Sequence, residues 1–155
     1  RFPRLEDAQI NAILSAQAPK ADAAMRAAAI VAVGGSPGAA LDFVTHDLKL
    51  LHRLMQDIAT KGDPGFILRG QMADAMGQRP DRHKQIAAVE LARAIAAAGM
   101  QDVSSAAIPE LVETHAALAR LSAAVPTANF DPGLLVLEIG TLLTRLAASR
   151  EPAHG

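Results

Sequence analysis

The sequence predicts an all-α fold, and two observations support this prediction. Apolar residues recur every three or four positions along most of the 155 residues, while the alternation typical of strands is nearly missing. Glycine and proline, which often begin or end helices, stand at regular places between the periodic segments. Half of the residues are apolar and many of these are alanine, the best helix former. We therefore expect closely packed helices and no sheet.

Three short helices are expected at the start of the chain, over residues 6–17, 21–33 and 37–45. Pro19 ends the first, and Gly34-Gly35 ends the second. Ser36 is a typical N-cap for the third, because its hydroxyl can accept a free amide proton of the first turn. Pro37 then occupies the first helical position, where its missing N–H has no consequence.

Five longer helices follow. They are expected over 47–60, from Asp63-Pro64 to Gly77, over 81–98, from beyond Ser105, and from Asp131-Pro132 to Ala148. Phe66, Ile67, Met72 and Met76 form the apolar residues of the fifth helix. The seventh carries its apolar face on Ile108, Leu111, Val112, His115, Leu118, Ala119 and Ser122. Pro109 is compatible with that helix only in its first turn.

The helix lengths indicate two parts with a boundary near His46. Residues 1–45 form a small module of three helices, and residues 46–150 form a bundle of five. Residues 151–155 are expected to be a loose tail. The chain begins with Arg1, so we expect it to be a fragment of a longer protein.

Composition and charge exclude several classes of function. The formal net charge is −1, whereas a nucleic-acid groove over the whole surface requires a basic excess. The absence of Trp and Tyr argues against a site that stacks bases or sugars. The absence of Cys excludes disulfides, thiolate metal sites and a cysteine nucleophile, and it fits a cytoplasmic location. No uninterrupted apolar run is long enough to span a membrane, and no signal-peptide pattern is present.

No pattern in the sequence predicts a catalytic, cofactor or metal site. The glycine-rich stretch before Pro37 resembles an anion-binding turn, but a phosphate loop also needs a lysine and a hydroxyl residue, and Ala39 and Ala40 follow instead. No two histidines are three or four residues apart, so no helix face presents a histidine pair. His115 lies on an apolar face, and we expect it to be buried and hydrogen-bonded. The chain is predicted not to be an enzyme.

The last helix is the candidate for a subunit interface. Four consecutive apolar residues begin at Leu134, so they point in all directions and must be covered on more than one side. A central place in the bundle and a partner subunit both provide such cover. The candidate interface residues are Leu134, Leu137, Glu138 and Arg145, with Glu138 and Arg145 as a possible ion pair.

A small basic cluster, Arg79, Arg82, His83 and Lys84, lies at the start of the sixth helix. The helix dipole disfavours cations at this end. A contact of Arg79, Arg82 and Lys84 with a partner or with phosphate would explain the placement, and a solvated helix end explains it more simply.

The run Gly35-Ser36-Pro37-Gly38-Ala39-Ala40-Leu41 resembles the lid-domain corner of the delta-prime subunits of the bacterial DNA polymerase III clamp loader. Arg4-Leu5 and the helix after it resemble the segment that enters this lid. The segment from Asn129 through Leu142 resembles the closing helix of the collar domain of these subunits. The similarity thus covers both ends of the chain, and residues 62–125 contribute little to it. Gly35, Ser36, Pro37, Gly38 and Leu41 carry the motif.

The resemblance implies a parent protein with an AAA+ ATPase-like core, a lid and a collar, of which residues 1–45 and 46–150 would be the lid and the collar. In ATP-hydrolysing relatives this corner carries the sensor-2 arginine, which contacts nucleotide phosphates, and Gly38 falls at that position. The resemblance therefore implies a stator without bound cofactor, inside a complex with DNA-directed DNA polymerase activity. Its partners would be the delta and gamma/tau subunits. The sliding clamp and DNA would be contacted mainly by the absent core.

Two other functions remain open from the residues. The ligand-binding and dimerisation domain of a transcription regulator has a similar number of helices, although its pocket usually has some aromatic lining, which this composition supplies poorly. A small helical enzyme is the other alternative, and no group of residues supports it.

Overall fold

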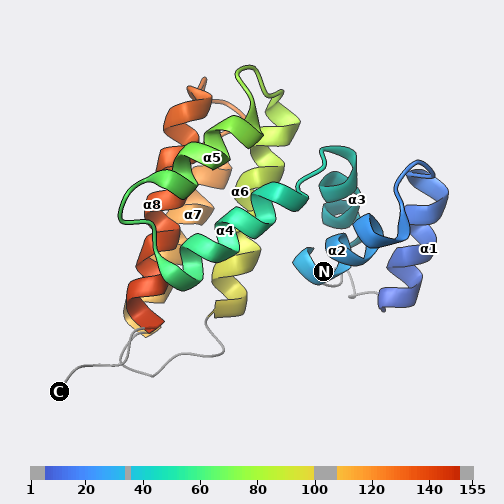
Figure 1. Ribbon diagram of the computed structural model, residues 1–155, viewed down its shortest axis with the longest axis horizontal. Coiled ribbons are helices and arrows are strands. Elements are labelled where there is room, and N and C mark those ends of the chain that lie inside the picture. Colours follow the sequence, from blue (N-terminus) through green and yellow to red (C-terminus); the bar gives the residue numbers. More distant parts are fainter. Residues whose placement is uncertain (1–5, 34–35, 100–107, 151–155) are drawn as a thin grey trace. The chain divides into compact units, whose positions relative to one another are not determined.

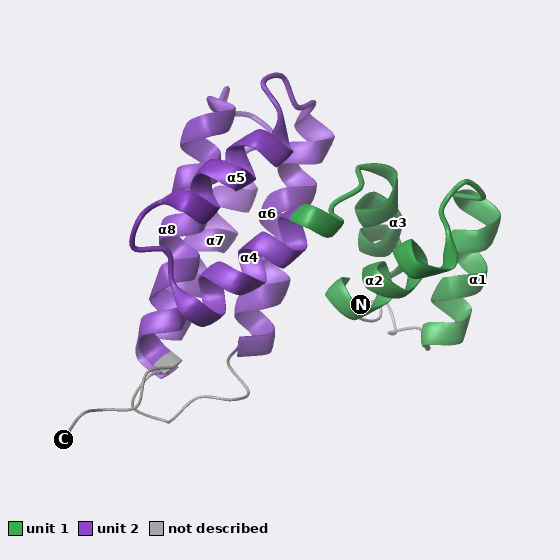
Figure 2. Cartoon of the chain, viewed as in Figure 1, with its two compact units in different colours: residues 1–50 green, residues 51–155 purple. Residues whose placement is uncertain are grey.

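The computed structural model describes residues 6–33, 36–99 and 108–150. Eight α-helices and no strands occur in these ranges, which confirms the all-α prediction (Figure 1). The chain divides into two compact units, residues 1–50 and 51–155 (Figure 2). The division falls between Leu50 and Leu51, later than the boundary after residue 45 that we expected from the sequence. The expected loose tail over 151–155, residues 1–5 and Gly35 of the motif lie outside the described residues.

Unit 1 contains three short helices, α1 (Asp7–Gln17), α2 (Ala23–Val33) and α3 (Pro37–Thr45). Each begins where a side chain satisfies a free amide proton of the first turn. Glu6 and Gln9 form a capping box at α1, and the Asp22 carboxylate accepts the Met25 N–H at 2.8 Å at α2. Ser36 Oγ accepts the Ala39 N–H at 3.3 Å at α3, as the sequence predicted. The three helices enclose a small core of Ile10, Leu14, Ala29, Ala40 and Phe43.

Unit 2 contains the five helices that follow among the described residues. They are α4 (Lys49–Lys61), α5 (Ile67–Met76), α6 (Arg82–Gly99), α7 (Ile108–Ala124) and α8 (Pro132–Arg150). The predicted breakers end helices here: Gly62 and Gly77 have φ angles of +76° and +88°, which glycine adopts without strain. Pro109 lies in the first turn of α7, as its chemistry requires.

The inner side of α8 forms much of the core of unit 2. Seven of its apolar side chains are buried, namely Leu135, Val136, Ile139, Leu142, Leu143, Leu146 and Ala147. The helix packs against α5, α6 and α7. Among the described helices, α8 alone is long and apolar enough, by length and composition, to cross a membrane. However, 44% of its segment Pro132–Ser149 is buried inside the protein. Its place in the core accounts for that apolar sequence.

Two helix faces differ from those predicted. In α7 the buried residues are Leu111, Thr114, Leu118 and Leu121, so the helix is turned relative to the expected face. The fully buried polar side chain is therefore Thr114, while His115 is only half-buried. The fifth helix was expected to start at Asp63-Pro64, with Phe66 and Ile67 among its apolar residues. α5 instead starts at Ile67, and Phe66 and Ile67 are 56% and 68% exposed. Arg69 of the same helix is buried, because its charge is paired with that of Asp63.

Candidate interaction surface

The outer side of α8 carries an exposed row of residues, which we call the α8 stripe. It consists of Leu134, Leu137, Glu138, Thr141, Arg145 and Ala148, all exposed and successively one, three or four residues apart. The four candidate interface residues all belong to this stripe. Leu134 and Leu137 are 65% and 41% exposed. Within the described chain, no ion pair joins Glu138 to Arg145, so the ion pair considered from the sequence does not form.

A buried ion pair lies directly behind the stripe. Arg69 Nε and Asp63 Oδ2 are 2.9 Å apart, and their side chains are only 6% and 3% exposed. Arg69 also donates to the Asp63 carbonyl at 2.7 Å and to Thr141 Oγ1 of the stripe at 3.1 Å. The Asp63 carboxylate in turn accepts the N–H groups of Leu68 and Arg69, each at 3.0 Å. The pair thus caps the start of α5 and ties it to α8.

The environment of Asp63 keeps its carboxyl group ionised. Burial, the largest single influence, raises the pKa. The hydrogen bonds from the Leu68 N–H and from Arg69, together with the Arg69 charge, outweigh burial, so the pKa of Asp63 lies below its ordinary value. The ion pair is therefore intact at neutral pH.

Gly140 provides the space for the Arg69 side chain. A Cβ at position 140 would lie 2.3 Å from Arg69 Cγ and 2.6 Å from Cδ. On the other side, the Arg69 guanidinium carbon lies 3.5 Å from the centre of the Phe66 ring, a cation–π contact. Phe66 holds this position with a φ of 59°, a left-handed conformation that is rare for a bulky residue. The network therefore places the exposed Phe66 beside the α8 stripe.

The sequence alone does not reveal this network, because Asp63 and Arg69 are six positions apart across a turn. One signal was available in Gly140, which interrupts an otherwise apolar helix. Such a glycine can leave room for a long side chain that crosses the helix at that point. The sequence does not indicate which side chain this is.

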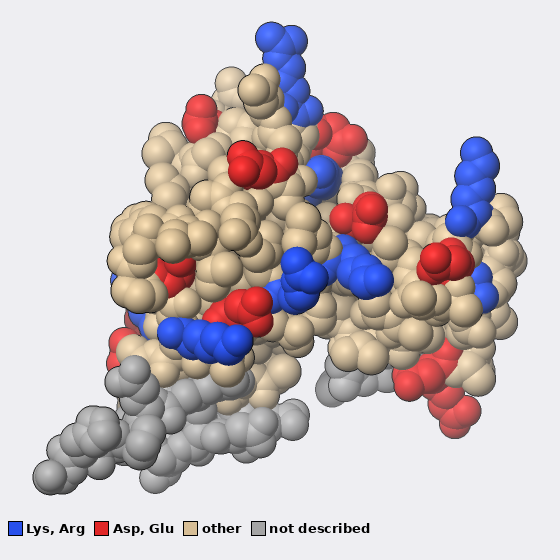
Figure 3. Space-filling view, viewed as in Figure 1, with Lys and Arg blue, Asp and Glu red and all other residues tan. Residues whose placement is uncertain are grey.

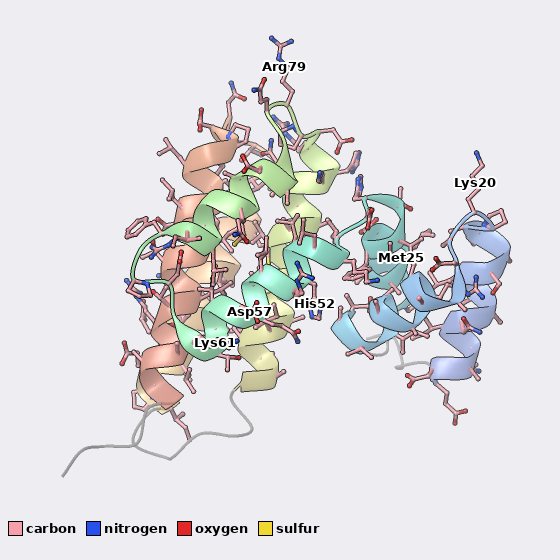
Figure 4. All side chains as sticks on the ribbon, in the orientation of Figure 1. Lys20, Met25, His52, Asp57, Lys61 and Arg79 are labelled. Carbon is pink, nitrogen blue, oxygen red and sulfur yellow. The ribbon has the colours of Figure 1, made fainter. Side chains whose placement is uncertain are left out.

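Two residues of the predicted basic cluster have partners at helix ends. Arg82 Nη1 donates to the Pro126 carbonyl at 2.8 Å, just beyond α7, and Lys84 Nζ donates to the Ala75 carbonyl at 3.1 Å, in the last turn of α5. Cations are favourable at such C-terminal ends. Asp81 caps α6 itself by accepting the Lys84 N–H at 2.7 Å. Arg79 points away from unit 2 (Figure 4), and a contact of this cluster with phosphate stays a prediction.

Surface charges give no sign of a nucleic-acid groove on the face seen in Figure 3, where basic and acidic side chains are interspersed. Within the described residues, no three His, Asp or Glu side chains gather as a metal site would require.

The turn before α3 has the geometry of a capped helix start. Ser36 is the cap, Pro37 the first helical residue, and Gly38 the second. A Cβ at Gly38 would meet nothing within 4 Å, and Gly38 is not buried. Packing therefore does not require glycine here, and a longer side chain would extend into open space.

Unit 1 also contains an open hollow of about 380 Å³. Its described lining consists of Ala18, Lys20, Ala21, Asp22, Met25, Val44, Thr45 and Asp47. None of these residues is aromatic, and Lys20 points outward (Figure 4). The lining differs from the largely apolar and aromatic pocket typical of a ligand-binding regulator.

Comparison of the chain with models of protein families, with curated proteins and with solved structures gave no match.

Proposed function

We propose that this chain is a non-catalytic part of a bacterial clamp-loader subunit of the delta-prime type, and that it holds neighbouring subunits in place during DNA replication. The proposal rests mainly on the Gly35–Leu41 corner and on its order relative to the last helix. Unit 1 would serve as the lid and unit 2 as the collar. The protein would act in the cytoplasm.

Three features of the structure support this proposal. Three short helices precede a larger helical unit, which is the order that the resemblance implies. Gly38 offers no side chain to a nucleotide, in keeping with a subunit that does not hydrolyse ATP. The α8 stripe exposes two leucines on the helix that would close the collar. An apolar face of this kind is typical of lasting subunit contacts.

The proposal predicts binding to the delta and gamma/tau subunits of the same organism. A tagged full chain should retain both subunits on an affinity column. The double variant Leu134→Arg/Leu137→Arg should retain neither subunit, because binding would have to remove two arginine charges from water. Val112→Arg is the matched control, since Val112 is 52% exposed on α7 and lies outside the stripe.

Two outcomes contradict the proposal. The first is that the wild-type chain retains neither subunit while it remains folded by circular dichroism. The second concerns the parent gene: an upstream helix-turn-helix, in place of an ATPase-like core, would instead support a transcription regulator.

A further inference from the structure

The charged residues of the α8 stripe make this surface complementary to itself. Glu138 and Arg145 are exposed, have opposite charges, and lie two helical turns apart on one face. Neither forms an ion pair among the described residues. Thr141 lies on the same face between them.

This spacing selects one way of pairing. If a second α8 lies antiparallel across the stripe, with the two-fold axis between Thr141 and Leu142, each Glu138 faces the Arg145 of the other copy. The same register brings Leu134 beside Ala148 and Ser149 of the other copy, a large apolar side chain against small ones. A parallel arrangement would instead place Glu138 opposite Glu138. Two-fold pairing needs a surface that matches its own copy, and the α8 stripe meets that requirement.

We propose that the α8 stripe binds a second copy of this chain, with the two α8 helices antiparallel. The stripe extends over about 20 Å at the rise of an α-helix. The exposed Phe66 ring stacks on the Arg69 guanidinium, which donates to Thr141, and so adds apolar surface at the edge of the contact. Thr141 is short, and its hydroxyl already accepts a hydrogen bond from Arg69, so two helices can approach closely at the axis.

This inference does not depend on the proposed clamp-loader role. A subunit that used the same face in an assembly would displace the second copy, and the two interactions are measured separately.

The test uses charge reversal on the full chain, with sedimentation equilibrium at low ionic strength as the measurement. The wild-type chain should dimerise reversibly. Glu138→Arg places two arginines opposite each other, and Arg145→Glu places two glutamates opposite each other. Each reversal occurs twice in the dimer, so each variant alone should dimerise at least about tenfold more weakly.

Mixing the two variants gives the decisive result. The chain with Glu138→Arg carries arginine at both charged positions of the stripe, and the chain with Arg145→Glu carries glutamate at both. In an equimolar mixture opposite charges therefore face each other, and the dimer should recover as a heterodimer. The combined variant Glu138→Arg/Arg145→Glu should dimerise like the wild type, since its charges are exchanged in both copies. Glu113→Arg is the matched control, because Glu113 is well exposed on α7 but lies outside the stripe, and it should leave dimerisation unchanged.

The proposal is overturned if the wild-type chain stays monomeric up to about 1 mM, a concentration at which even weak pairing is detected. It is equally overturned if the single reversals leave dimerisation unchanged, or if the mixture associates no better than its separate components. Circular dichroism of each variant distinguishes loss of pairing from loss of folding.

Discussion

Replacing Asp63 by asparagine tests whether the buried ion pair behind the α8 stripe determines the stability of unit 2. The substitution keeps the size of the side chain and removes its charge. The carboxylate accepts three hydrogen bonds, from Leu68 N–H, Arg69 N–H and Arg69 Nε. An asparagine amide offers one oxygen and one NH₂ group, so at least one of these donors would face another donor.

The expected cost is large because Arg69 cannot reach water. Its side chain is 6% exposed, and after the substitution its charge would have only neutral acceptors, namely the backbone carbonyl of residue 63, Thr141 and at most one amide oxygen. Breaking a buried pair by removing one partner typically costs about 3–5 kcal/mol. We therefore expect Asp63→Asn to lower the free energy of unfolding by about 3 kcal/mol or more, well above the value of an exposed pair.

Urea unfolding at pH 7, followed by circular dichroism, measures this change, since the chain has no Trp or Tyr for fluorescence. The double variant Asp63→Asn/Arg69→Met is the control. It removes both charges and should recover part of the loss, because a neutral pair is not penalised by burial. A loss below about 1 kcal/mol for Asp63→Asn would show that the pair behaves like a surface ion pair, and the argument would fail.

Three further predictions follow from the same structure. Gly140→Ala should destabilise unit 2 by about 1–3 kcal/mol, because the new methyl group overlaps Arg69. Gly70→Ala should stabilise unit 2 by about 0.5–1 kcal/mol, because Gly70 is exposed on α5 with open space around it. The urea midpoints of the two variants should therefore move in opposite directions. Thr114→Val should raise the free energy of unfolding by about 1 kcal/mol, since Thr114 Oγ1 is buried and has no hydrogen-bond partner among the described residues; a lowered thermal midpoint would contradict this. The pKa of Asp63 is lower in the folded state than its ordinary value of 3.8. The stability that the ionised Asp63 contributes is therefore present above pH 3.8 and is lost as the pH falls through the folded-state pKa. Acid titration of the wild type should show this loss of stability, and acid titration of Asp63→Asn should not.

The local sequence determines where helices begin and end, and this part of the fold was predictable. Ser36 caps α3 and Gly77 ends α5 at the expected positions, because these effects need only the residue and its nearest neighbours. The all-α class follows from the same short-range periodicity.

The inward faces of short helices were less predictable. A helix of ten residues such as α5 contains too few turns to fix its apolar face from spacing alone. Arg69 is buried only because Asp63 and Thr141 satisfy it, and Thr141 is 72 positions away. In α7, a helix of 17 residues, His115 was expected on the buried face, and Thr114 is buried there instead, because the helix is turned relative to the expected face.

The α8 stripe lies between these cases. Thr141 and Ala148 were not predicted, and Glu138 and Arg145 were considered as an ion pair. Leu134 and Leu137 were predicted as interface residues because the four consecutive apolar side chains of residues 134–137 cannot all face one core. Which of them stay outside depended on the packing of α5, α6 and α7 around the helix. The sequence also indicated the basic cluster, but not that Arg82 and Lys84 bind carbonyl groups of other helices.

The space that Gly140 leaves for Arg69 also affects the order in which parts of unit 2 can pack during synthesis. Arg69 leaves the ribosome long before Gly140 and Thr141 are synthesised. Until then the Arg69 guanidinium can bind the nearby Asp63 carboxylate, but it lacks both the space beside Gly140 and the Thr141 hydroxyl that it contacts in the folded protein. The start of α5 can therefore be fixed in place only after α8 has emerged, so α8 docks after the other helices of unit 2 have been made.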